Sequence, residues 1–154
     1  MRVEKIVSGG QTGADRAALD VALERGVPIG GWVPKGRLAE DGPIPERYTG
    51  LAETESSDPA IRTRLNVRDS DATLIVSHGP LAGGSLLTLQ EARRRGKPVL
   101  HLDLLETTPE TAAARLRLWL VVADARTLNV AGPRASKDAA IFAAVVTLLR
   151  SALP

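Results

Sequence analysis

Residues 3–26 read VEKIVSGGQTGADRAALDVALERG, and their pattern gives the first indication of the fold class. The apolar run that begins at Val3 predicts a short buried strand ending at Ser8. The residues from Thr12 to Arg25 carry apolar side chains at helical spacing, and Gly26 is typical of a helix C-terminus. The stretch therefore predicts a strand, a tight glycine-rich turn and a helix in direct succession.

The same alternation continues along the chain and predicts an α/β fold. Strands are expected over residues 27–33, 51–54, 71–77, 98–102 and 128–131, and helices over residues 59–69, 86–95, 109–122 and 137–153, with Thr108 and Ser136 as N-caps. Short strands that are apolar on both faces are typical of a parallel sheet covered on both sides. We therefore predict a three-layer Rossmann-like domain with a mainly parallel sheet flanked by helices.

Composition limits the possible functions. A chain of 154 residues with 44% hydrophobic content closes one core, so residues 1–154 are expected to form a single domain. No apolar run of about 18 residues or signal-peptide core occurs, so we expect a cytoplasmic protein without a membrane span. The chain has no cysteine and two histidines, so no protein-held metal is expected. The net charge of +2 and the low aromatic content of 3% favour a small anionic partner over nucleic acid.

Three glycine-rich loops are expected at the carboxyl ends of the strands, where ligands bind in such sheets. They are SGGQTGAD (residues 8–15), SHGPLAGGSLLT (residues 77–88) and NVAGPRASK (residues 129–137). Each precedes a helix, whose free N–H groups and positive dipole end attract an anion. The first loop matches neither a Walker loop, because Ala14 and Asp15 follow Gly13, nor a dinucleotide fingerprint, because Ser8 replaces the first glycine. The other interpretation of this loop is a simple strand-to-helix turn.

Other segments add candidate residues. The long loop over residues 34–50 has the composition of an ordered lid, and His78 and His101 have no evident partner in the sequence. The candidate ligand-binding residues are Gly9, Gly10, Gln11, Thr12, Gly13, Arg16, Lys35, Arg37, Arg62, Gly83, Gly84, Ser85, Thr88, Asn129, Gly132, Arg134 and Ser136.

Five segments together resemble the molybdenum-cofactor carrier family. They are SGGQTGADRAALD, PKGRLAEDGPIPERY, RTRLNVRDSDATLIV, GGSLLTLQEA and LNVAGPRASK, which span residues 8–137. That family belongs to a wider nucleotide-binding Rossmann-like group that includes the lysine-decarboxylase-like, cytokinin-activating phosphoribohydrolases. The resemblance implies a soluble oligomer that carries the molybdenum cofactor (molybdopterin) or a related phosphorylated pterin, with the three glycine-rich loops at the pocket.

The alternative is a nucleoside 5'-monophosphate phosphoribohydrolase-like enzyme or a nucleotide-binding sensor. The hydrolases carry G-G-x-G-T-x-x-E, whereas residues 83–91 read GGSLLTLQE, one residue longer and without the third glycine. Glu91 is the candidate catalytic residue if the protein is an enzyme, and no catalytic residue is expected in a carrier. We favour the carrier.

The last two helices predict self-association. Their apolar residues exceed what one buried face needs, so we expect a homodimer or a homotetramer. These residues are Leu116, Trp119, Leu120, Val121, Ile141, Phe142, Val145, Val146 and Leu149.

Overall fold

The computed structural model describes residues 2–154, in which strands and helices alternate as predicted. The strands are β1 (Lys5–Val7), β2 (Ile29–Val33), β3 (Leu38–Ala39), β4 (Gly42–Pro43), β5 (Leu51–Glu53), β6 (Ala72–Ser77), β7 (Val99–Asp103) and β8 (Thr127–Ala131). The helices are α1 (Ala14–Glu24), α2 (Pro59–Arg68), α3 (Gly83–Arg94), α4 (Pro109–Val122) and α5 (Ile141–Ala152). None of these helices is long and apolar enough to cross a membrane.

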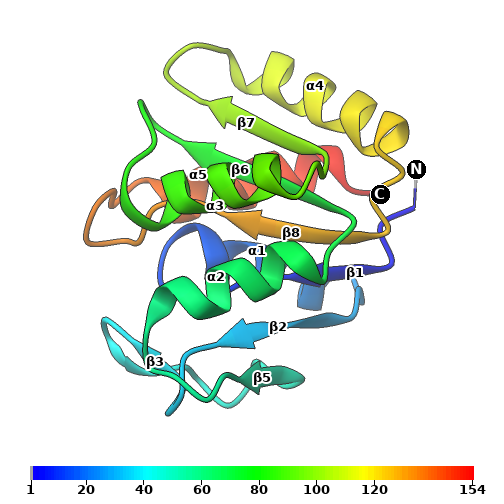
Figure 1. Cartoon of the computed structure of the whole chain (residues 1–154). Helices are drawn as coiled ribbons and strands as arrows, with labels where there is room; N and C mark the ends of the chain where they lie inside the picture. Colours follow the sequence, from blue (N-terminus) through cyan, green and yellow to red (C-terminus); the bar gives the residue numbers. More distant parts are fainter. Residues whose placement is uncertain (1) are drawn as a thin grey trace.

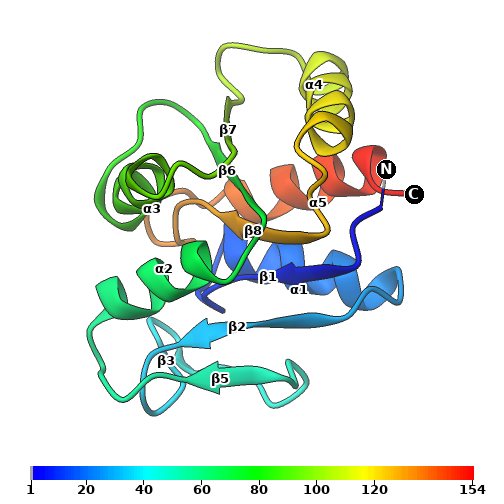
Figure 2. The same cartoon turned by 45° about the vertical axis from the view of Figure 1, so that its right-hand side comes forward.

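Six strands form one parallel sheet in the order β5-β2-β1-β8-β6-β7. The last strand, β8, lies between β1 and β6, so the first and last segments of the chain meet at the centre of the sheet (Figure 1). Figure 2 shows α2 and α3 on one face of the sheet and α1, α4 and α5 on the other. The prediction of a three-layer α/β domain with a parallel sheet is therefore confirmed.

The two helical layers differ in polarity. Helices α1, α4 and α5 bury alanine, leucine, valine and isoleucine side chains against the sheet and form the main core. Helices α2 and α3 bury mostly polar side chains, including Asn66, Ser85, Thr88 and Glu91. Strand β6 is buried along its whole length because it lies between two neighbouring strands and under both layers. The polar layer borders the site described below.

Helix boundaries differ from the prediction at α3 and α5. Helix α3 begins three residues early, because the N–H of Leu86 donates to the carbonyl of Ala82 and brings the glycine pair into the first turn. Helix α5 begins at Ile141 instead of Lys137, because the N–H groups of residues 137 and 138 both donate to the carbonyl of Arg134 and form a separate turn. Ser136 is therefore not its N-cap. The predicted cap at Thr108 is confirmed by its bond from the N–H of Thr111.

The long loop after β2 contains a small antiparallel hairpin that the sequence did not predict. Ala39 pairs with Gly42, so Glu40 and Asp41 form a two-residue turn between β3 and β4. Leu38 and Pro43 form the other pair, and the hairpin stands apart from the main sheet. Two carboxylates therefore lie at its tip.

Candidate ligand-binding site

A cavity of about 610 Å³ opens at the carboxyl edge of the sheet. Its walls come from the loops after β1, β6 and β8 and from the first residues of α2 and α3, all of which lie toward the left of Figure 1. Its volume is within the range of small-molecule sites. The candidate residues that line it are Gln11, Arg62, Gly83, Gly84, Ser85, Thr88, Gly132 and Arg134.

Three cationic side chains line this cavity, from Arg62, Arg134 and Lys137. The Arg62 side chain is only 15% exposed, and its Nη1 lies 3.8 Å from Oδ2 of Asp15. Within residues 2–154 its Nε has no hydrogen-bond partner, and Arg134 and Lys137 form no ion pair. Burial lowers the pKa of the Arg62 guanidinium. A buried guanidinium with an unused donor is well suited to bind an anion.

Asp15 lies beside this cation in the first turn of α1. Its carboxylate is buried and accepts a hydrogen bond of 3.1 Å from the N–H of Gln11. Burial raises the pKa of Asp15 to about 6, although the Arg62 guanidinium acts in the opposite direction. The Asp15 carboxylate therefore partly offsets the positive charge of Arg62 at neutral pH. When Asp15 is protonated, this offset is lost.

The first turn of α3 forms another wall of the cavity. A Cβ added to Gly83 or Gly84 would meet no protein atom within 4 Å, so both glycines face open space. The N-cap residue, Ala82, makes no side-chain bond to the first-turn N–H groups. Ser85 is 7% exposed and, among the described residues, its hydroxyl has no hydrogen-bond partner, whereas the Thr88 hydroxyl donates to the carbonyl of Gly84 at 2.8 Å. This helix end therefore offers unused donors to a ligand.

The glycines of the first loop contact protein atoms instead of open space. A Cβ on Gly10 would lie 2.9 Å from Cδ1 of Ile44, and one on Gly13 would lie 2.4 Å from the carbonyl oxygen of Pro133. Both have positive φ angles, of 69° and 80°. Here the glycines allow the loop after β1 to pack against its neighbours.

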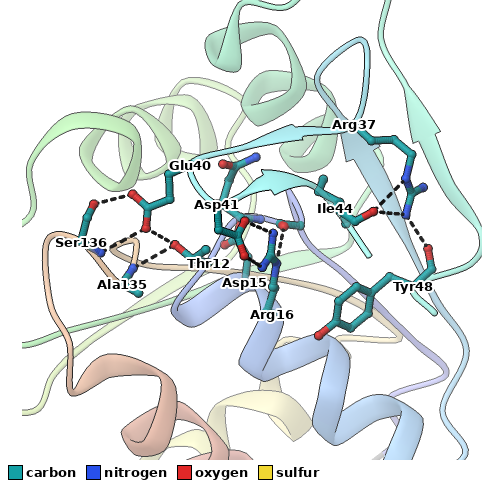
Figure 3. A network of polar contacts seen from close by, with 12 residues as sticks. Thr12, Asp15, Arg16, Arg37, Glu40, Asp41, Ile44, Tyr48, Ala135 and Ser136 are labelled. Atoms are coloured by element: carbon teal, nitrogen blue, oxygen red, sulfur yellow. Dashed lines mark hydrogen bonds and ion pairs between the residues drawn. The ribbon is translucent and has the colours of Figure 1, made fainter. Parts of the chain in front are cut away.

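The hairpin is fastened to the carboxyl edge by its two turn carboxylates (Figure 3). Glu40 accepts hydrogen bonds from the hydroxyls of Thr12 and Ser136 and, at 3.1 Å, from the N–H of Ser136. Asp41 accepts two hydrogen bonds from Arg16, of 2.5 and 2.8 Å. The bonds from Ser136 and Thr12 lower the pKa of Glu40, and the bond from Arg16 lowers the pKa of Asp41. The hydroxyls of Thr12 and Ser136, which the sequence analysis assigned to ligand binding, therefore donate to Glu40 of the same chain.

Two other candidates outside the cavity, Arg37 and Asn129, have side-chain partners within the protein. Arg37 donates to the carbonyls of Ile44, Pro45 and Tyr48 and shapes the loop after the hairpin (Figure 3). Asn129 donates to Thr73 across the centre of the sheet, at 3.3 Å. The residues that lie outside the cavity lining are Gly9, Gly10, Thr12, Gly13, Arg16, Lys35, Arg37, Asn129 and Ser136.

Glu91, the candidate catalytic residue of the enzyme alternative, is buried and lies outside the cavity lining. Its carboxylate accepts hydrogen bonds from Arg94, at 2.5 and 3.1 Å, and from Arg95, at 2.9 Å. These bonds, the one from Arg94 above all, lower the pKa of Glu91 to about 2. In this position the carboxylate fixes the end of α3 and has no free oxygen directed to a ligand site.

Both histidines have side-chain partners that the sequence did not reveal. Nδ1 of His78 lies 2.6 Å from Oδ2 of Asp138, and both residues line the cavity. Nε2 of His101 lies 2.7 Å from the Ser77 hydroxyl, and burial lowers the pKa of His101. His78 and Asp138 are 60 positions apart, a separation at which local sequence patterns carry no signal. Across residues 2–154, no three His, Cys, Asp or Glu side chains gather as a metal site would require.

Comparisons with known proteins place this geometry in a family. The model of the circularly permutated YpsA SLOG family matches residues 6–153. The crystal structure of a protein described as a putative molybdenum carrier protein, from Syntrophus aciditrophicus SB, is 53% identical in sequence and has a TM-score of 0.96, over 99% of this chain and 96% of the other. A comparison with curated proteins found no match.

Proposed function

Because the chain belongs to the circularly permutated YpsA SLOG family, we propose that it binds and carries the molybdenum cofactor, or a related phosphorylated pterin, in the cavity at the carboxyl edge of its sheet. The similarity to a protein described as a molybdenum carrier supports the nature of the cargo. The main support for an anion site in this cavity is the buried guanidinium of Arg62, whose Nε has no hydrogen-bond partner among the described residues.

The cargo's phosphate would lie between Arg62 and the first turn of α3. There the guanidinium, the N–H groups around Gly84 and the Ser85 hydroxyl would all donate to phosphate oxygens. Arg134 and Lys137 would add positive charge along the same wall. The rest of the cavity, whose whole volume is about 610 Å³, would accept the pterin ring.

The position of Glu91 supports carriage over hydrolysis. Cleavage of an N-glycosidic bond needs a carboxylate beside the reacting carbon. The Glu91 carboxylate instead accepts three hydrogen bonds from two arginines and lies outside the cavity lining. The cargo would therefore be held and released unchanged.

Two measurements test this function. Mass spectrometry of small molecules released from freshly purified protein should detect a pterin; a nucleotide as the bound species would contradict the proposed cargo. In titration calorimetry with a pterin monophosphate, Arg62→Ala should weaken binding about tenfold to a hundredfold, the effect of one charged hydrogen bond. Arg64 is an exposed arginine on the same helix, so Arg64→Ala is the matched control and should leave the affinity unchanged. Equal affinities in all three proteins would contradict the proposed site.

We also propose that the protein forms a homodimer or homotetramer through α4. Leu118, Val121 and Val122 are 67%, 56% and 76% exposed. Leu116 and Leu120 of α4 and most of the apolar residues of α5, which the sequence analysis counted toward self-association, are instead buried in the core. Such a group of exposed apolar side chains is typical of a protein interface. Light scattering at micromolar concentration should give the mass of a dimer or tetramer for the wild-type protein. The Val122→Glu variant should give a mass closer to that of the monomer. A monomeric wild-type protein would contradict this part of the proposal.

A further inference from the structure

His78 is held in a fixed orientation at the wall of the cavity. It follows β6, and its Nδ1 lies 2.6 Å from Oδ2 of Asp138. The other carboxylate oxygen of Asp138 accepts the N–H of Ala140 at 3.0 Å, so the carboxylate is itself fixed by the backbone before α5. The two side chains are 25% and 18% exposed. The pair therefore joins the end of one strand to the turn before a helix.

This hydrogen bond decides which ring nitrogen carries the proton. An aspartate carboxylate accepts hydrogen bonds and does not donate them, so the proton of the neutral imidazole lies on Nδ1. Nε2 then has a free lone pair, and it has no partner among the residues that the structure describes. The neutral form of His78 thus has an acceptor, Nε2, that no described residue uses.

The other polar groups of the cavity make such an acceptor valuable. Arg62, Arg134 and Lys137 are donors only, as are the N–H groups of the first turn of α3. These groups suit the anionic part of a ligand, whereas its N–H and O–H groups need acceptors, which the lining offers at few side chains, among them Gln11, Ser85 and His78. Asp15 does not serve this purpose fully, because its carboxylate already accepts the N–H of Gln11 and faces Arg62.

We propose that His78, held by Asp138, accepts a hydrogen bond from the ligand in this cavity and selects anionic ligands that also carry an N–H or O–H donor. Asp138 acts as a positioning residue that keeps the Nδ1 proton in place. The inference rests on the cavity being the ligand site of the proposed function. A pterin ring with its N–H and amino groups has the required donors, whereas sulfate at neutral pH has none.

The proton position can be measured without a ligand. Nitrogen NMR of the protein at pH 8, where an ordinary imidazole is neutral, should place the His78 proton on Nδ1. The His78→Gln variant assigns the signal, because only His101 remains. Asp138→Asn should move part of the signal to the form with the proton on Nε2, and Asp124→Asn, a matched change at an exposed aspartate, should not. A proton on Nε2 of His78 in the wild-type protein would overturn the proposal.

Calorimetry with two probes tests the selection. His78→Phe should weaken binding of a pterin monophosphate about tenfold, the effect expected for the loss of one hydrogen bond, and should leave binding of sulfate within twofold. Asp138→Asn should weaken only the pterin probe, by a smaller factor. An equal effect on both probes, or none on the pterin, would overturn the inference while leaving the cavity as the anion site. A wild-type protein that binds neither probe would instead contradict the proposed function, and the inference would fall with it.

Discussion

The guanidinium of Arg62 occupies the space that a side chain on Gly9 would need. A Cβ added to Gly9 would lie 2.1 Å from Nη1 of Arg62 and 3.0 Å from Oδ2 of Asp15. The glycine therefore allows the cation from α2 to reach the loop after β1 and to lie beside the carboxylate of α1. This contact connects the glycine-rich loop to the guanidinium that we propose binds the anion.

Gly9→Ala should displace Arg62 and weaken anion binding. The clash is with the far end of a flexible side chain, so the protein should still fold, while the affinity for a pterin monophosphate should fall about tenfold, as for a weakened charged hydrogen bond. Titration calorimetry provides the measurement. In an Arg62→Ala background the same change should have little further effect, because the two changes act through one interaction. Fully additive losses would show that Gly9 acts independently of Arg62.

The fold was predictable from local patterns because a buried parallel strand and an amphipathic helix differ in period. Glycines before a helix also predicted which strand-end loops meet at one edge. Long-range contacts were not predictable in this way. The partners of Glu40, at residues 12 and 136, and that of His78, at residue 138, depend on how the loops fold back.

The same limit applies to the individual site residues. The sequence indicated that Arg16 and Arg62 were both candidate ligands, but it could not show that Asp41 engages one of them while the other keeps an unused donor. In the sequence, Arg94 and Arg95 stand three and four positions after Glu91, a spacing that allows ion pairs on a helix, but this spacing does not reveal that the carboxylate is buried. Burial follows from packing in three dimensions, which single-sequence patterns predict only for regular apolar faces.

Asp15→Asn should remove a pH-dependent cost to stability. The pKa of Asp15 is raised to about 6 from an ordinary value of 3.8, so its contribution to stability is greatest below pH 3.8 and is lost as the pH rises through 6. The stability of the variant relative to wild type should therefore increase by about 2 kcal/mol between pH 4.5 and pH 7.5. Urea unfolding of both proteins at the two pH values measures this difference. A difference that does not change with pH would contradict the assigned pKa.

Glu40→Ala should loosen the hairpin. The carboxylate fastens the turn between β3 and β4 to Thr12 and Ser136, so its loss should speed amide hydrogen exchange at Ile44, whose N–H donates to the carbonyl of Arg37. Since the pKa of Glu40 is lowered, the wild-type protein should lose the same protection as the pH falls below the ordinary range of a glutamate. Glu55→Ala, an exposed glutamate after β5, is the control. Unchanged exchange at Ile44 would mean that the hairpin does not depend on Glu40.

Glu91→Gln should affect stability and not binding. The carboxylate accepts bonds from Arg94 and Arg95, so its replacement should lower the free energy of unfolding by about 1–3 kcal/mol. Because its pKa is lowered to about 2, the wild-type contribution is present above the ordinary glutamate pKa and is lost as the pH falls toward 2. Affinity for a pterin monophosphate should stay within twofold, measured by calorimetry beside a base-release assay with AMP. Base release by the wild-type protein that stops in this variant would support the hydrolase instead.

A crystal structure of the protein with a bound pterin monophosphate would show whether the cavity at the carboxyl edge of the sheet holds the ligand. We expect the phosphate to lie within about 3 Å of donors from Arg62 and from the first turn of α3. The pterin ring should fill the same cavity on the side of His78. A pterin bound instead in the groove between α4 and α5, beside Arg117 and Thr147, or a cavity that stays empty at saturating ligand, would contradict it.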